Sequence, residues 1–137
     1  MTAALWLRVA SVISLLFAAG HTLGGRKDWS PIGASEVLTA MGTFRLEFQG
    51  VSRTYLDFYR GFGYTISVTQ LLQAVLLWQL AAIAKRDPLL VRPMIAAFAL
   101  ATLACACLAW RFIFPVPAVF AAVLAACLAV AFFLARA

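Results

Sequence analysis

The chain has 137 residues, of which 65% are hydrophobic and 12% are charged, and its formal net charge is +6. Its mean hydropathy of +0.97 lies outside the range of ordinary soluble domains, which excludes a soluble fold and predicts an integral membrane protein. The basic residues stand at expected helix ends and loops, where Lys and Arg anchor proteins at the membrane interface. No basic run is interleaved with aromatic residues, so we expect no nucleic-acid partner.

Four apolar runs are each long enough to cross about 30 Å of hydrocarbon as a helix that rises 1.5 Å per residue. They cover about residues 4–23, 58–84, 89–110 and 115–135. Together they use most of the chain, so we expect a single integral membrane domain, residues 1–137. The connections predict an all-α, up-down-up-down transmembrane four-helix bundle.

The segments between these runs contain recognisable helix boundaries. The first span ends at Gly24-Gly25, because glycine commonly stops a helix. Residues 35–48 show helical periodicity but are too short to span, which predicts an amphipathic helix at the interface or over the bundle, ended by Gly50. Asp87-Pro88 are a natural N-cap and first residue for the third span.

Small residues recur at four-residue spacing on three spans, and such ridges let helices approach closely in lipid, within one chain or in a homo-oligomer. The ridges are Ala10, Ser14, Ala18 and Thr22; Ala97, Ala101, Cys105 and Ala109; and Ala118, Ala122 and Ala126. On the second span, Gln70, Gln73 and Gln79 are expected to form hydrogen bonds between helices.

Four spans place both termini on one side of the membrane, together with a short loop carrying Lys85, Arg86 and Arg92. The positive-inside rule therefore predicts that both termini are cytoplasmic. The charge bias is small, because the other side carries Arg26, Lys27, Arg45, Arg53, Arg60 and Arg111.

Residues 53–78 carry a helical stripe that begins with charged residues and ends with apolar ones. At about 100° per residue, its members fall within a narrow arc: Arg53, Asp57, Arg60, Tyr64, Ser67, Leu71, Val75 and Trp78. Exposing Arg and Asp to lipid is costly, so the stripe is typical of a slot for an amphiphilic ligand. We expect Tyr64 and Ser67 to face the bundle interior, with Leu71 and Trp78 on the same side.

Polar residues of several segments should meet at the end of the bundle where the second span begins. The predicted ligand-binding residues are Arg53, Asp57, Arg60, Tyr64, Ser67, Trp110 and Arg111, and the catalytic candidates are His21, Glu47 and Asp57. A guanidinium matches anionic or carbonyl oxygens. A histidine can exchange protons near neutral pH.

Local structural roles compete with these functions. Thr54 and Asp57 match a capping box, in which the acid bonds the backbone at a helix start. Asp57 could instead pair with Arg53 or Arg60. The arginines could extend to lipid headgroups, and His21 could be a hydrogen-bonded residue at a helix end.

We expect no cofactor and no metal site. His21 is the only histidine, and Cys105, Cys107 and Cys127 lie within predicted spans without CxxC spacing. The acids are scattered, so no zinc or di-iron pattern occurs. Gly61-Phe62-Gly63 follows a helix start rather than a strand, and we interpret it as a close-packing site instead of a dinucleotide fingerprint.

Two stretches carry a resemblance. Ala19-Gly20-His21-Thr22-Leu23-Gly24-Gly25 and Ser52-Arg53-Thr54-Tyr55-Leu56-Asp57-Phe58-Tyr59-Arg60-Gly61-Phe62-Gly63 resemble those of a family of small bacterial four-span membrane proteins with no established activity. The resemblance runs through most of the chain and implies a bacterial origin and four spans, and with them a location in the bacterial inner (cytoplasmic) membrane. More loosely, the bundle is similar in architecture to membrane sterol isomerases and anthrone oxygenases, with no shared motif.

These features predict a protein that binds a membrane lipid or another hydrophobic small molecule, lipid-like or aromatic, in a polar-topped pocket of the bundle. Two alternatives stay open. One is a cofactor-independent enzyme with isomerase-type acid-base chemistry, and the other is a structural or partner-binding membrane subunit whose charges pair internally or with another protein. Transport is disfavoured because the chain lacks repeats and broken helices.

Overall fold

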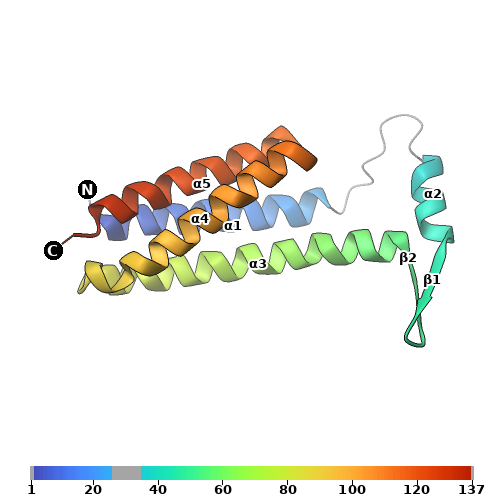
Figure 1. Cartoon of the computed structure of the whole chain (residues 1–137), viewed down its shortest axis with the longest axis horizontal. Helices are drawn as coiled ribbons and strands as arrows, with labels where there is room; N and C mark the ends of the chain where they lie inside the picture. The colour runs from blue at the N-terminus through green and yellow to red at the C-terminus, as the bar shows by residue number, and fades with distance from the viewer. Residues whose placement is uncertain (1, 26–34, 137) are drawn as a thin grey trace. The chain divides into compact units, whose positions relative to one another are not determined.

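The computed structural model describes residues 2–25 and 35–136. Within these ranges it contains five helices and one β-hairpin, in the order α1 (Ala3–Gly24), α2 (Ser35–Thr43), β1 (Arg45–Phe48), β2 (Val51–Thr54), α3 (Tyr55–Ala84), α4 (Pro88–Phe112) and α5 (Pro115–Leu134) (Figure 1). Four of these helices, α1, α3, α4 and α5, are long and apolar enough to cross a membrane. The predicted all-α fold, with a short helix between the first two long ones, is confirmed.

The chain forms two compact units. The bundle unit comprises Met1–Phe17 and Gln70–Ala137, and the hairpin unit comprises Ala18–Thr69. Helices α1 and α3 therefore contribute residues to both units.

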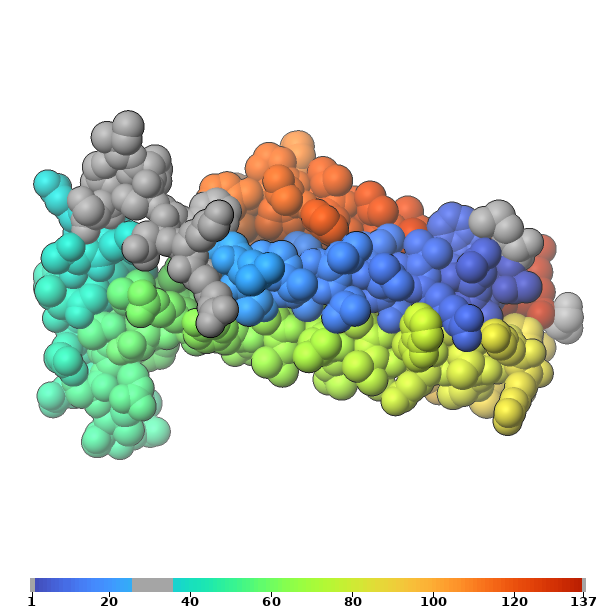
Figure 2. Space-filling view, turned by 180° about the vertical axis from the view of Figure 1, so that it is seen from behind, coloured from blue at the N-terminus to red at the C-terminus, as the bar shows by residue number. Residues whose placement is uncertain are grey.

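In the bundle unit, hydrogen bonds join α1 to α3. Ser11 Oγ donates to the carbonyl oxygen of Ala74 at 2.6 Å, and Ser14 Oγ donates to Gln70 Oε1 at 3.0 Å. Rising residue numbers on α1 thus meet falling numbers on α3, so the two helices are antiparallel. Figure 2 shows α1, in blue, lying along α3 in light green.

The other two helices complete the bundle unit. Gln73 Nε2 of α3 donates to Thr102 Oγ1 of α4 at 3.3 Å, and α4 packs along α5. The ring of Phe17 on α1 lies 5.6 Å from the ring of Phe120 on α5, between centroids. The predicted hydrogen bonds between helices are thus confirmed for Gln70 and Gln73, whereas Gln79 is exposed.

The core of the bundle unit mixes alanines with larger apolar side chains from all four helices. Small residues let the backbones approach, and the larger side chains fill the space between them. Its buried members are Ala3, Ala4, Leu7, Ala10, Leu77, Leu80, Ala81, Ala84, Val91, Ile95, Leu124, Cys127, Leu128, Ala131 and Ala135.

The predicted small-residue ridges are buried on α1 but mostly exposed on α4 and α5. Ala10 and Ser14 are fully buried, whereas the exposed ridge residues are Ala97, Ala101, Cys105, Ala122 and Ala126. As contacts within one chain the ridges therefore fail on α4 and α5, because an alanine-rich helix has several rows of small residues and a four-residue row drifts about 40° per step. On α4 the buried row instead includes Ile95, Thr102 and Ala106, which are seven and four residues apart.

Two predicted helix boundaries are confirmed. Asp87 Oδ1 accepts the N–H of Leu90 at 3.0 Å, and Pro88 is the first residue of α4. At the end of α1, the N–H of Gly25 donates to the carbonyl oxygen of His21 at 2.8 Å. A Cβ at Gly25 would lie 3.2 Å from that oxygen, which is tighter than an ordinary contact, so glycine suits this position.

In the hairpin unit, the helix predicted over residues 35–48 ends at Thr43, and the rest of that segment is strand β1. It pairs antiparallel with β2, with Leu46 opposite Arg53 and Phe48 opposite Val51. The linking residues Gln49 and Gly50 have φ values of +52° and +77°, the signs that a tight two-residue hairpin turn requires. The helical prediction was wrong for residues 45–48, because apolar residues at 44, 46 and 48 also alternate with a period of two, as a strand does.

Candidate functional site

A reciprocal capping box holds the start of α3. The N–H of Thr54 donates to Asp57 Oδ2 at 2.8 Å, and the N–H of Asp57 donates to Thr54 Oγ1 at 3.1 Å. Two backbone donors that a helix start leaves without partners are satisfied in this way. The predicted capping role of Asp57 is therefore confirmed, and Oδ1 is the carboxylate oxygen that the box does not use.

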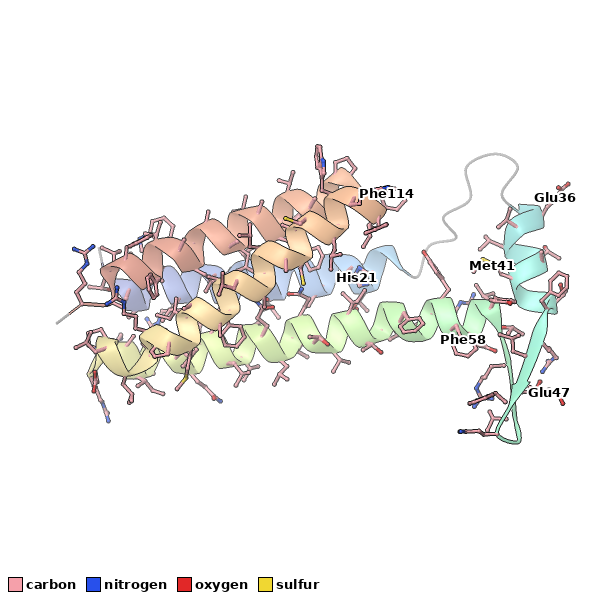
Figure 3. The ribbon with its side chains drawn as sticks, in the orientation of Figure 1. His21, Glu36, Met41, Glu47, Phe58 and Phe114 are labelled. Carbon is pink, nitrogen blue, oxygen red and sulfur yellow. The ribbon has the colours of Figure 1, made fainter. Side chains whose placement is uncertain are left out.

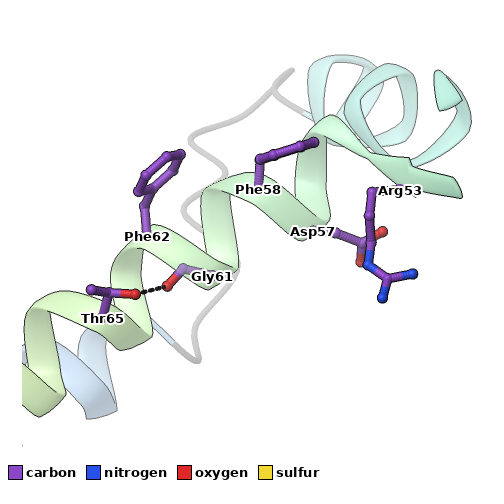
Figure 4. Close-up of a pocket in the computed structure, with 6 residues that line it drawn as sticks. All are labelled: Arg53, Asp57, Phe58, Gly61, Phe62 and Thr65. Carbon is purple, nitrogen blue, oxygen red and sulfur yellow. Dashed lines mark hydrogen bonds between the residues drawn. The ribbon is translucent and has the colours of Figure 1, made fainter. Parts of the chain in front are cut away.

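An open groove of about 290 Å³ lies beside the first turns of α3 (Figure 4). Figure 4 shows Arg53 and Asp57 at one end of the groove and Phe62 and Thr65 at the other. The lining changes from charged to aromatic along the helix, and its members are Arg53, Asp57, Phe58, Gly61, Phe62 and Thr65.

The backbone shapes the middle of this groove. A Cβ at Gly61 would meet nothing within 4 Å, so the predicted close packing is wrong for Gly61, whose missing side chain leaves the groove open. Thr65 Oγ1 donates to the carbonyl oxygen of Gly61 at 2.9 Å. This hydrogen bond turns the threonine hydroxyl back onto the helix.

The end of α1 packs against the side of α3 that faces away from the groove. His21 Nε2 lies 3.1 Å from the carbonyl oxygen of Gly63 (Figure 3), and Thr22 Oγ1 donates to Ser67 Oγ at 2.9 Å. Gly63 is two residues from Gly61, which is about 200° around a helix. His21 therefore acts here as a hydrogen-bonded residue at a helix end, and it does not line the groove.

The other predicted residues of the hairpin unit have exposed side chains outside the groove. Glu47 lies on β1, paired with Ser52 (Figure 3). Arg60 and Tyr64 lie on α3 and are exposed. Arg53 belongs to β2 and not to a helix, so it does not continue a helical stripe through Asp57.

The bundle unit holds the rest of the predicted site and stripe. Trp110 and Arg111 are exposed near the end of α4, where the guanidinium carbon of Arg111 lies 5.1 Å from the ring centroid of Phe112. Leu71 and Trp78 are about half exposed. The predicted interior orientation is therefore wrong for Tyr64, Leu71 and Trp78, while Ser67 does face α1 through Thr22.

The stripe prediction missed Phe58, Phe62 and Thr65. It followed steps of three and four residues from Asp57 through Arg60 and Tyr64, whereas the groove follows two parallel rows with four-residue spacing. The sequence does contain these two rows: Asp57, Gly61 and Thr65 form one, and Phe58 and Phe62 form the other. A glycine between polar residues on a helix face, flanked by aromatic residues, marks such a depression.

In the part of the chain that the structure describes, no three His, Cys, Asp or Glu side chains could hold a metal ion together. The chain matches no protein-family model, no curated protein and no solved structure. Its resemblance to a bacterial four-span family therefore stays a prediction. The function has to be inferred from the residues and geometry of the molecule itself.

Proposed function

We propose that this chain is a bacterial inner-membrane protein, with both termini in the cytoplasm, that binds a lipid-like or aromatic small molecule in the groove on α3. The observation that carries the proposal is the order of groups along the groove. A guanidinium and a carboxylate stand at one end, and two phenyl rings follow. An amphiphile has the same order of polar and apolar parts. The four helices able to span a membrane support the proposed location.

The polar end of the groove suits a headgroup that both donates and accepts hydrogen bonds. Arg53 is exposed, and its Nη1 donates to the carbonyl oxygen of Ser52 at 2.9 Å. A guanidinium has five N–H donors, so others can reach a carboxylate, phosphate or carbonyl oxygen of a ligand. Asp57 Oδ1 can accept a hydrogen bond from a hydroxyl or amine, because the capping box uses Oδ2.

The apolar end favours a ligand with one chain or one ring system. Phe58 is 47% exposed and Phe62 is 68% exposed, so both rings can gain van der Waals contacts with an apolar chain or ring. The groove volume of about 290 Å³ lies just below the range of ligand pockets, roughly 300–1,000 Å³. A phospholipid with two chains would exceed it.

The groove supports binding better than acid-base catalysis. Of the three catalytic candidates, only Asp57 lines it, and that carboxylate also holds the start of α3. His21 lies against Gly63 on the other side of α3, and Glu47 lies on β1 outside the groove. We therefore propose a binding protein and assign no catalytic residue.

A dansyl-labelled fatty acid tests this proposal on protein in lipid nanodiscs. We expect Phe62→Ala to weaken the affinity about tenfold, which corresponds to about 1.4 kcal/mol, because the ring loses its contact with the chain. Tyr64→Ala is the matched control, since Tyr64 is a half-exposed aromatic residue of the same helix outside the groove. Equal losses in the two variants would contradict the assignment of the site.

The polar end is tested separately with a pair of arginine variants. We expect Arg53→Gln to weaken binding of the fatty acid but not of its uncharged dansyl amide analogue, because only the carboxylate pairs with the guanidinium. Arg60→Gln is the control, as it removes the same charge from an exposed residue outside the groove. Equal weakening by both variants would indicate a general charge effect instead of a headgroup contact.

A further inference from the structure

Two arginines of the bundle unit lie inside candidate membrane spans and are half-buried. Arg8 is in the second turn of α1, and Arg92 is in the second turn of α4. The Nε atom of each is buried and has no hydrogen-bond partner among residues 2–25 and 35–136. Buried polar groups in proteins are nearly always hydrogen-bonded, so each of these guanidinium groups is left short of an acceptor by the described residues.

Each of these arginines stacks on an aromatic ring of a neighbouring helix. The guanidinium carbon of Arg8 lies 5.0 Å from the ring centroid of Trp78, and that of Arg92 lies 4.5 Å from the ring centroid of Phe132. The attraction between a cation and the face of an aromatic ring fixes the position of the guanidinium. It does not use the N–H groups in the guanidinium plane, which are the donors that match oxygen anions.

Both stacked pairs lie at the same end of the bundle unit. The starts of α1 and α4 and the ends of α3 and α5 lie at that end (Figure 1). From the helix bounds and a rise of 1.5 Å per residue, Arg8 and Trp78 lie about 7–9 Å from the ends of their helices, and Arg92 about 6 Å. That depth corresponds to the boundary between lipid headgroups and acyl chains, about 5–10 Å into the interface.

The same end of the bundle unit is rich in positive charge and poor in acids. Lys85, Arg86 and Arg136 add to the two stacked arginines. Asp87 is the only acid in the sequence of residues 1–17 and 70–137, and its Oδ1 already accepts the N–H that caps α4. No further side-chain carboxylate in these two ranges is therefore left to pair with the two half-buried arginines.

We propose that Arg8 and Arg92 bind phosphate groups of anionic phospholipids at this end of the bundle unit. Phosphate oxygens match the guanidinium donors in geometry and charge. Basic pockets between membrane helices on the cytoplasmic side bind anionic headgroups in the same manner. Trp78 is 52% exposed and offers a surface for the acyl chain of the same lipid. This site shares no residue with the groove on α3, so a failure of the ligand proposal for the groove would not affect the lipid proposal.

Thermal unfolding in nanodiscs tests the lipid site, with phosphatidylcholine alone compared with a mixture containing phosphatidylglycerol. A lipid that binds only the folded state raises the melting temperature, and we expect a shift of roughly 5 °C for the wild type. The double variant Arg8→Gln with Arg92→Gln should lose most of this shift. Arg8→Lys, which keeps the charge but not the planar donors, should lose part of it.

Arg86→Gln is the matched control, because it removes the same charge from an exposed residue at the same end and should keep most of the shift. Equal losses in Arg86→Gln and Arg8→Gln would overturn the proposal in favour of a general surface potential. An undiminished shift in the double variant would show that the arginines serve only the aromatic contacts. An equal stabilisation by inorganic phosphate in detergent would assign the site to free phosphate instead of a lipid.

Native mass spectrometry gives a readout that does not depend on how stable each variant is. We expect wild-type protein to retain phosphatidylglycerol in preference to phosphatidylcholine after gentle removal of detergent. Each single arginine variant should retain less than half as much. Retention equal to that of the wild type in both single variants would also overturn the proposal.

Discussion

The two parts of α3 differ in how they use their side chains. From Gln70 to Ala84, in the bundle unit, the helix buries one apolar row: Ala74, Leu77, Leu80, Ala81 and Ala84. From Tyr55 to Thr69, in the hairpin unit, only Leu56, Gly63 and Ser67 are half-buried and the aromatic side chains are exposed. One continuous helix thus serves packing in one unit, and in the other it presents aromatic and charged groups outward.

The largest effect should come from the buried row. Leu77 has no exposed surface, so Leu77→Ala should destabilise the protein by about 2–4 kcal/mol through lost packing and a cavity. Leu72→Ala is the control on the same helix, because Leu72 is 55% exposed, and it should cost well under about 1 kcal/mol. Equilibrium unfolding in mixed micelles measures both variants. Similar losses of stability in the two variants would mean that the buried and the exposed side of this part of α3 contribute equally to the fold.

Most of the fold was predictable from the sequence because its signals are local. The lengths of the apolar runs predict the four spanning helices. Asp87 and Thr54 mark helix starts, because the side chain of each accepts a hydrogen bond from a backbone amide only three residues away. The hairpin was not predictable from periodicity, since residues 44–48 fit both helical and strand periods. The positive φ values at Gln49 and Gly50 favour a hairpin over a helix, and these values depend on how the turn folds.

The candidate site was predictable only in part. The charged start of the predicted stripe included Arg53 and Asp57, and both line the groove. The side of α3 that faces α1 depends on contacts across more than 40 residues of sequence, such as Thr22 with Ser67, which no local pattern contains. The four-residue spacing of Phe58 and Phe62 is visible in the sequence, but those distant contacts decide that this face of α3 is left uncovered by α1.

A smaller effect should follow from opening the capping box in the hairpin unit. Thr54→Ala removes the oxygen that accepts the N–H of Asp57 and should cost about 1 kcal/mol. Hydrogen exchange should speed up at the first amides of α3 and not at those near Leu77, because the loss is local. Thr65→Ala, which removes a hydroxyl bonded within the helix to Gly61, is the control. Faster exchange along the whole helix would show that the two parts of α3 unfold together.

The smallest effect should come from the polar contact between α1 and α3 in the bundle unit. Ser14 is fully buried and its hydroxyl donates to Gln70 Oε1. Hydrogen bonds between membrane helices average only about 0.6 kcal/mol, because polar groups also find partners in the unfolded state within the membrane. A double-mutant cycle of Ser14→Ala with Gln70→Ala should therefore give a coupling energy near that value.

Gln79→Ala provides the control for this cycle, since Gln79 is an exposed glutamine of the same helix and should show no coupling to Ser14→Ala. A coupling energy between Ser14 and Gln70 that matched the loss expected at Leu77 would contradict the view that apolar packing dominates this part of α3. It would mean that the polar pair, rather than the alanine and leucine row, holds the two helices together. Absence of any coupling would instead show that the serine is buried there only for its small size.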